Sequence, residues 1–224
     1  MIRPPFVVVS DFDGTITTID LVVALTTRVD NANQQTVDRI NRRELGLYDG
    51  LTELFSRLPS GDRLQYEDYL RHLARFRSGF HRFERALKDA AIPFYIVSNG
   101  LDFILDAVLG PEEPHGPRRI SNQARFDGPS IAIEWRYPCV APCPGGCGLC
   151  KHQVVAELSL KHNAPVVYIG DGVTDINGAR RADRVYARSH LAQWLEAEHV
   201  AYRPFETFDD ILSDLFLVKE AACE

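Results

Sequence analysis

Three short apolar runs divide the chain and predict buried β-strands. They are FVVVS at 6–10, PFYIVS at 93–98 and PVVYIG at 165–170, and each is rich in β-branched or aromatic residues. Continuous rather than alternating apolar runs are typical of parallel strands covered by helices on both faces. Helical spacing of apolar residues appears beside these runs, as in GFHRFERALKDAAI and HQVVAELSLKHN. The pattern predicts an α/β fold with a doubly wound, mostly parallel, Rossmann-like sheet.

Two segments depart from this alternation. Residues 17–79 contain only helical patterns, such as GLYDGLTELFSRL, and predict a helical cap inserted after the first strand. The α/β core then comprises residues 1–16 and 80–224. Residues 119–137 predict a β-hairpin with its turn at Asp127 and Gly128, because Ile131, Ile133 and Trp135 alternate with polar residues. A cysteine-rich run follows the hairpin.

Composition and charge narrow the class of protein. The residues are 45% hydrophobic and 25% charged, which is ordinary for a globular chain, and the formal net charge is −6. Short basic stretches such as NRRELG are flanked by acids, so we expect no nucleic-acid partner. The apolar run at 6–9 is too short for a signal peptide or a membrane span, so we expect no membrane association and a cytoplasmic location.

Acidic residues follow two of the predicted strands. Asp11 and Asp13 in SDFDGT come directly after the first strand, and they should point the same way, about 6 to 7 Å apart along the chain. Asp171 and Asp175 in GDGVTD follow the third strand. A single Asp after a strand is often only a helix cap or a turn residue. Two pairs at one sheet edge repel unless a cation lies between them, and oxygen ligands favour Mg²⁺.

The second strand and Lys151 supply groups that suit a phosphate. SNG at 98–100 offers the Ser98 hydroxyl and, from Asn99 onward, the backbone N–H groups that lead into the next helix, a ready anion site. Lys151 precedes the third strand, at the start of its preceding helix, where its charge would balance phosphate and carboxylates. Three strand ends therefore predict one site for a phosphate ester.

The residues DFDGT at 11–15, SNG at 98–100, Lys151 and GDGVTD at 170–175 stand in an order that resembles the haloacid dehalogenase-like phosphatases. The resemblance implies that Asp11 is the nucleophile that becomes an aspartyl-phosphate and that Asp13 is the general acid and base. It implies phosphate contacts from Ser98 and Lys151. It also implies a magnesium site made by Asp11, the backbone carbonyl of Asp13, and Asp171, with Asp175 in support.

A closer resemblance covers most of the chain outside the predicted cap. RSGFHRFERALKDAAIPFYIVSNGLDFIL, the hairpin, CVAPCPGGCGLCK and VYIGDGVTD are together similar to the methionine-salvage phosphatase branch, which is related to phosphoserine phosphatases. The resemblance implies hydrolysis of 2-hydroxy-3-keto-5-methylthiopentenyl-1-phosphate. The alternatives are phosphoserine phosphatase or another small-metabolite phosphatase, and a non-catalytic metal-binding scaffold. The cap departs most from the family pattern, so the substrate stays open.

Four of the five cysteines lie in CVAPCPGGCGLCK, directly before Lys151. The spacing of Cys139, Cys143, Cys147 and Cys150 offers four thiolates, enough for a closed structural Zn²⁺ site. It lacks the long spacer between two C-x2-C pairs that is typical of zinc ribbons. Zinc, free thiols and a disulfide all stay open from the sequence, although clustered cysteines in the cytosol favour metal ligands or reactive thiols.

Overall fold

The computed structural model describes residues 4–139 and 146–216 of the chain, and within them the strands form one seven-stranded sheet in the order β4-β3-β2-β1-β5-β6-β7. All neighbouring strands pair in parallel except β3 and β4, which are antiparallel. The strands are β1 (Val7–Ser10), β2 (Phe94–Leu101), β3 (Arg118–Arg125), β4 (Ala132–Glu134), β5 (Val166–Gly170), β6 (Arg184–Ala187) and β7 (Arg203–Pro204). The predicted α/β class with a mostly parallel sheet is confirmed.

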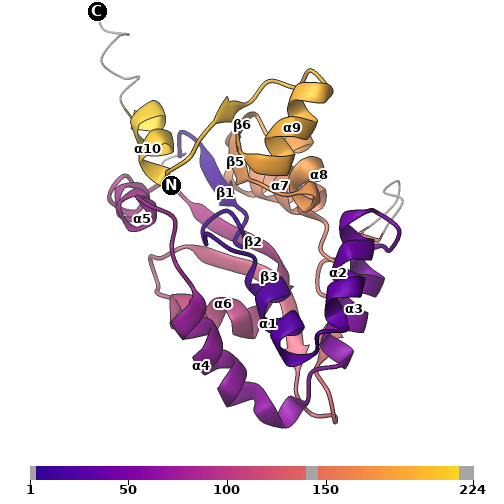
Figure 1. Ribbon diagram of the computed structural model, residues 1–224. Coiled ribbons are helices and arrows are strands. Elements are labelled where there is room, and N and C mark those ends of the chain that lie inside the picture. Colours follow the sequence, from indigo (N-terminus) through magenta and orange to yellow (C-terminus); the bar gives the residue numbers. More distant parts are fainter. Residues whose placement is uncertain (1–3, 140–145, 217–224) are drawn as a thin grey trace, which may run out of the picture.

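Helices cover both faces of this sheet, as the continuous apolar strands predicted. In β1, Val8 contributes to one apolar core and its neighbours Val7 and Val9 to the other, because successive side chains point to opposite faces. Figure 1 shows α7, α8 and α9 grouped on one face, with α5 and α6 on the other. The core helices are α5 (Phe80–Asp89), α6 (Asp102–Leu109), α7 (Lys151–His162), α8 (Ile176–Arg181), α9 (Ser189–Ala197) and α10 (Phe208–Phe216).

Four α-helices lie between β1 and α5, in the segment 17–79 where the sequence predicts only helices. They are α1 (Leu21–Val29), α2 (Asn33–Asn41), α3 (Leu47–Ser56) and α4 (Arg63–Leu73), with a short 3₁₀ helix, η1 (Ser60–Asp62), before α4. The chain segments that enter and leave this group run side by side, since Thr18 N–H donates to Arg75 O at 2.9 Å and Arg77 N–H donates to Ile16 O at 2.8 Å. These helices lie together at one end of the molecule (Figure 1). That they act as a cap stays a prediction.

The predicted hairpin is present but its second strand is short. β3 pairs antiparallel with β4, which ends at Glu134 rather than continuing to the cysteine run. The backbone before β4 pairs instead with the helical segment, because Ile131 N–H donates to Leu58 O at 2.9 Å and Ser60 N–H donates to Pro129 O at 3.1 Å. The hairpin therefore connects the sheet to the helices inserted after β1.

The end of β2 also differs from the prediction. The sequence places the strand end at Ser98, whereas β2 continues to Leu101, with irregular pairing to β3 between Val97 and Leu101. Ser98 thus lies in a bulged part of the strand, and α6 begins only at Asp102. Such bulges re-aim side chains beside functional sites, and here the bulge replaces the helix start that the sequence predicts next to Ser98.

Across residues 4–139 and 146–216, none of the helices combines the length and apolar character needed to cross a bilayer.

Candidate active site

Asp11 and Asp13 extend from the carboxyl end of β1, at the centre of the sheet. Asp11 N–H donates to Ile169 O of β5 at 2.9 Å, which fixes the Asp11 backbone beside the end of that strand. Asp13 Oδ1 accepts from Leu21 N–H at 2.8 Å, and Asp13 Oδ2 accepts from the Ser98 hydroxyl at 3.4 Å. The first turn of α1 and the bulge of β2 therefore hold the Asp13 carboxylate from two sides.

Gly14 allows the loop after Asp13 to approach the end of β5. Its φ is +77°, and a Cβ at this position would lie 2.6 Å from Asp171 Oδ2. Any other residue would be strained and would displace the Asp171 carboxylate. This explains physically why a glycine follows the two aspartates.

Lys151 is the first residue of α7, and its side chain is almost completely buried between carboxylates. Its Nζ donates to Asp11 Oδ1 and, at 2.7 Å, to Asp175 Oδ1. Burial alone would lower the pKa of Lys151, but the charges of Asp11 and Asp175 outweigh it and raise that pKa above its usual value. The two carboxylates therefore favour the charged ammonium form of Lys151 at the sheet edge.

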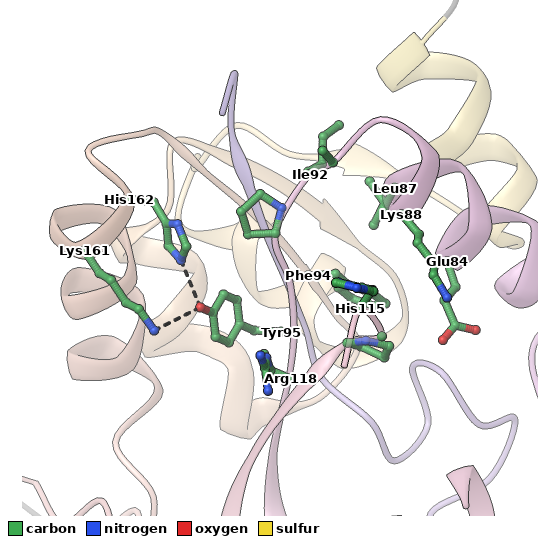
Figure 2. Close-up of a pocket in the computed structure, with 14 residues that line it drawn as sticks. Glu84, Leu87, Lys88, Ile92, Phe94, Tyr95, His115, Arg118, Lys161 and His162 are labelled. Carbon is green, nitrogen blue, oxygen red and sulfur yellow. Dashed lines mark hydrogen bonds between the residues drawn. The ribbon is translucent and has the colours of Figure 1, made fainter. Parts of the chain in front are cut away.

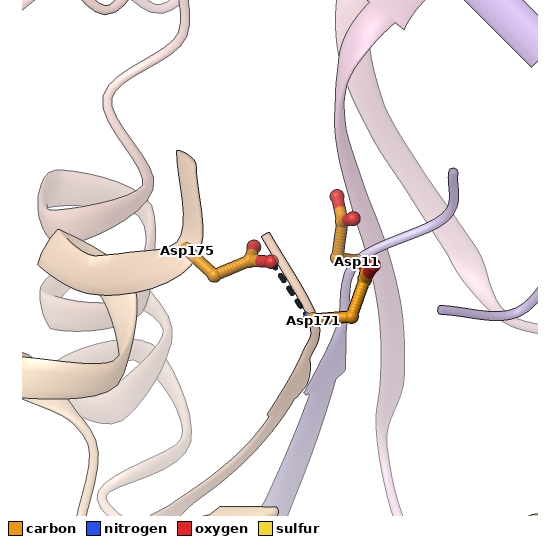
Figure 3. A group of neighbouring side chains, drawn as sticks. All are labelled: Asp11, Asp171 and Asp175. Atoms are coloured by element: carbon orange, nitrogen blue, oxygen red, sulfur yellow. Dashed lines mark hydrogen bonds between the residues drawn. The ribbon is translucent and has the colours of Figure 1, made fainter. Parts of the chain in front are cut away.

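Three carboxylates converge on this edge (Figure 3). Asp11, Asp171 and Asp175 each have an oxygen within 4.8 Å of the others. Asp171 Oδ1 accepts from the Thr15 hydroxyl at 2.7 Å, so the loop after β1 orients it. Within the described residues, this group does not include the Asp13 side chain, so the magnesium contact that the resemblance implies for Asp13 falls to its backbone carbonyl alone.

The two oxygens of Asp175 are already bound. Oδ1 accepts from Lys151 and from the Tyr168 hydroxyl, both at 2.7 Å. Oδ2 accepts from the backbone N–H groups of Asp171 at 3.1 Å and Gly172 at 2.9 Å. Asp175 thus holds Lys151 and the turn after β5, whereas Asp11 and Asp171 have oxygens to spare for a ligand.

The electrostatics of the group fit a divalent cation. Burial, followed by the charge of Asp175, raises the pKa of Asp11 well above its usual range and that of Asp171 to about 6. One ammonium among three carboxylates leaves a net negative charge, and the donors are all hard oxygen atoms. Mg²⁺ suits such a donor set.

The pKa of Asp13 is raised to about 8, mainly by burial and then by the neighbouring charge of Asp20. The hydrogen bond from Leu21 and the charge of Lys151 act in the opposite direction but do not cancel the burial effect. These effects together favour the protonated form of the Asp13 carboxyl. A raised pKa suits the general-acid role that the resemblance implies for Asp13, because a leaving alkoxide needs a proton.

Sequence reasoning missed several residues that support the site. Arg77 is buried and donates through Nε to Thr15 O at 2.8 Å and through a terminal nitrogen to Gly14 O at 2.5 Å. Arg77 follows the last helix of the insert, and from there it fixes the loop that carries Asp11 and Asp13. Tyr168 supports Asp175 from within β5. Nothing in the local sequence marks Arg77, whereas Thr15 belongs to the DGT motif itself.

Asn99 has a role that the sequence does not predict. Its side-chain nitrogen donates to Cys147 O at 2.6 Å and to Leu149 O at 3.3 Å, so its amide holds the cysteine loop. Only its backbone N–H remains for the phosphate contact that the sequence predicts. Lys151 follows this loop directly, so Asn99 links the bulge of β2 to the start of α7.

The cysteine loop also contacts the helical insert. Tyr48 of α3 donates its N–H to Gly146 O at 3.0 Å, and its ring stacks on Trp135 at 4.3 Å between ring centroids. Cys150 N–H donates to Tyr137 O at 2.8 Å. Cys139, Cys147 and Cys150 are described, but Cys143 lies outside the described residues, so the four-cysteine zinc site stays a prediction.

Comparison with known proteins agrees with this geometry. The family model described as haloacid dehalogenase-like hydrolase matches residues 8–180. A Bacillus cereus protein named 2-hydroxy-3-keto-5-methylthiopentenyl-1-phosphate phosphatase is 34% identical over 215 residues, which cover 94% of this chain and 95% of the relative. A Bacillus mycoides protein of the same name is 34% identical over 206 residues, 92% of this chain and 93% of that one.

Solved structures show the same fold at low sequence identity. A phospho-aspartyl intermediate analogue of phosphoserine phosphatase superposes with a TM-score of 0.69 at 15% identity, covering 94% of this chain and 99% of that one. Phosphoserine phosphatase from T. onnurineus gives a TM-score of 0.70 at 14% identity, with 94% of each chain covered. From the family match, the relatives and the shared fold, we conclude that the chain belongs to the haloacid dehalogenase-like hydrolases.

Proposed function

We propose that this protein is a magnesium-dependent phosphomonoesterase that forms an aspartyl-phosphate on Asp11. The single observation that carries this proposal is the position of Lys151, buried between Asp11 and Asp175 with Asp171 alongside. A carboxylate nucleophile beside a fixed ammonium can receive a phosphoryl group, because the ammonium then neutralises the phosphoryl oxygens. The phosphatase names of the relatives point to the same reaction.

The chain's own residues account for both chemical steps. An oxygen of Asp11 attacks phosphorus, the bond from phosphorus to the leaving oxygen breaks, and Asp13 gives its proton to that oxygen. Asp13 then takes a proton from water, the water oxygen attacks phosphorus, and the bond to Asp11 breaks. Ser98 and the backbone N–H of Asn99 are the proposed phosphate donors, together with Lys151. When bound, Mg²⁺ neutralises charge on the phosphate and on the carboxylates of Asp11 and Asp171.

We propose 2-hydroxy-3-keto-5-methylthiopentenyl-1-phosphate as the substrate, because relatives named for it are 34% identical across nearly the whole chain. Phosphoserine is the alternative, since the fold is shared with phosphoserine phosphatases. Residues 17–79 would act as the cap, which would contact and select the substrate and exclude bulk water. The cytoplasmic location and the lack of nucleic-acid partners stay predictions.

A kinetic screen tests the function and the substrate together. We expect kcat/KM for the methylthiopentenyl phosphate to exceed that for phosphoserine by roughly 10² or more, the scale on which an apolar pocket discriminates. A preference for phosphoserine would support the alternative. If none of the phosphate esters tested is hydrolysed with Mg²⁺ present, the result would favour a non-catalytic scaffold over a phosphatase.

We also propose that Cys139, Cys143, Cys147 and Cys150 bind a structural Zn²⁺. Their spacing supplies four thiolates without an open position for water. The last part of the loop is held by two contacts, since Asn99 donates to Cys147 O and Cys150 N–H donates to Tyr137 O. A cross-link between these anchors would hold the chain that enters Lys151 without taking part in the chemistry.

A further inference from the structure

A cavity of about 610 Å³ opens at the edge of the sheet opposite the candidate active site. Its wall includes the start of β2 at Phe94 and Tyr95, the start of β3 at Arg118, and the end of α7 at Lys161 and His162. α7 has twelve residues, and at 1.5 Å per residue Lys161 lies about 15 Å along the helix from Lys151. The cavity is therefore distinct from the site at Asp11, although α7 and β2 contribute to both.

The charge of this cavity is opposite to that of the whole chain. The chain has a net charge of −6, yet one acidic side chain, Glu84, faces a set of basic side chains in the lining. Figure 2 shows these basic groups around the cavity, on elements from both sides of the sheet. They are Lys88, His115, Arg118, Lys161 and His162.

Structural roles explain only part of this set. A lysine and a histidine in the last turn of α7 interact favourably with the helix dipole. Lys88 pairs with Glu113 at 3.3 Å and Arg118 pairs with Glu112 at 3.5 Å, but both acids lie outside the cavity lining. Neither role explains why side chains from α5, β3 and α7 point to one cavity.

The most buried polar group of the cavity is already oriented by its neighbours. Tyr95 is 6% exposed, and its hydroxyl lies 3.3 Å from Lys161 Nζ and 2.9 Å from His162 Nε2. Lysine can only donate, so the Tyr95 proton is left for His162. Burial and then the charge of Lys161 lower the pKa of His162, which keeps Nε2 able to accept. Lys161 is thereby held at the cavity wall with further N–H groups to offer.

A second cavity, of about 270 Å³, adjoins the first. It shares Glu84, Gly116 and Pro117 with the first cavity, and both Glu113 and Arg119 line it. The Arg119 side chain is 9% exposed, and its Nε has no hydrogen-bond partner among the residues that the structure describes. The rest of its guanidinium is paired, because Nη1 donates to Asp106 Oδ1 and to Gly110 O, both at 2.7 Å, so the charge for a ligand comes from Lys161 and Arg118 rather than from Arg119.

We propose that this basic cavity binds a small organic anion, a carboxylate or a phosphate on an apolar body, at a second site apart from the active site. The volume falls in the range of small-molecule sites. Leu87, Ile92 and Phe94 supply an apolar wall for the body of the ligand, and Lys161 and Arg118 supply the charge for its head. The proposal does not depend on the reaction that Asp11 performs.

Calorimetric titration of the full chain with benzoate, with phenylphosphonate and with neutral benzyl alcohol tests this site. Phenylphosphonate cannot be hydrolysed, and titration in EDTA keeps it from binding the active site through a metal. We expect at least one of the two anions to bind at least tenfold more tightly than benzyl alcohol. The tighter anion identifies the head group as carboxylate or phosphate.

Variants then locate the binding. Lys161→Glu should raise the Kd of the tighter-binding anion by tenfold or more. The milder Lys161→Gln should raise it by threefold or more. Arg71→Glu removes an exposed arginine of α4 outside both cavities and should change Kd by less than twofold. Both Lys161 variants should keep the phosphatase kcat/KM of the unmodified chain. The proposal is overturned if neither anion binds at 10 mM, if the neutral probe binds equally well, or if Lys161→Glu leaves Kd unchanged.

Discussion

Replacing Lys151 with methionine should destabilise the metal-free protein strongly. The methionine keeps the length of the side chain but removes the one ammonium that contacts both Asp11 and Asp175. Three carboxylates within 4.8 Å of one another then lack a bonded cation. Removing one partner from a buried ion pair typically costs about 3–5 kcal/mol, a large part of the roughly 5–15 kcal/mol that stabilises a domain.

The effect can be measured as a change in melting temperature. For a domain of this size, each kcal/mol corresponds to roughly 2–4 °C, so we expect Lys151→Met to lower Tm by roughly 6–20 °C in EDTA. Mg²⁺ should recover part of this loss, because binding at a hundredfold excess over Kd contributes about 2.7 kcal/mol and relieves the same carboxylate repulsion.

A control at an exposed lysine separates the effect of burial from the effect of losing a charge. Lys88→Met removes an exposed lysine whose ion pair with Glu113 is worth about 0–1 kcal/mol, so its Tm should fall by at most a few degrees. Differential scanning fluorimetry of both variants, with and without Mg²⁺, makes the comparison. A fall for Lys151→Met no larger than that for Lys88→Met would refute the reasoning that Lys151 balances buried charge.

Three further predictions follow from the same site. Asp11→Asn should abolish phosphatase turnover while leaving the fold intact, whereas Asp13→Asn should lower kcat by about 10² to 10⁴, the usual scale of lost acid–base help; steady-state kinetics would contradict this if Asp11→Asn turned over normally. In EDTA, Tm should fall as pH rises from 5 to 8, because Asp171 and Asp13 have raised pKa values of about 6 and about 8, so the folded state binds protons that the unfolded state releases; a Tm that rises over this range would contradict it. Protein purified without chelator should contain about one zinc per chain, and Cys147→Ser should lower both zinc content and turnover while Mg²⁺ dependence persists; no zinc, together with full activity of Cys147→Ser, would reject the zinc proposal.

Local sequence patterns predicted the central strands β1, β2 and β5 and the hairpin of β3 and β4, but not β6 and β7. Continuous apolar runs determine buried parallel strands, because only strands covered on both faces need no polar side. Asp11 and Asp171 come directly after two such runs, so the sheet itself brings them together. Lys151 begins the helix that leads into the third run, and this order along the chain places its ammonium at the same edge.

Contacts between distant parts of the chain depended on packing that no local pattern encodes. Arg77 reaches the carbonyls of Gly14 and Thr15, more than sixty residues earlier, only because the two ends of the helical insert run side by side. Asn99 reaches the cysteine loop in the same way. The basic cavity is lined by the ends of α5 and α7, which lie on opposite faces of the sheet. Periodicity reports which face of an element is buried, whereas the partner on that face is decided only when the whole chain packs.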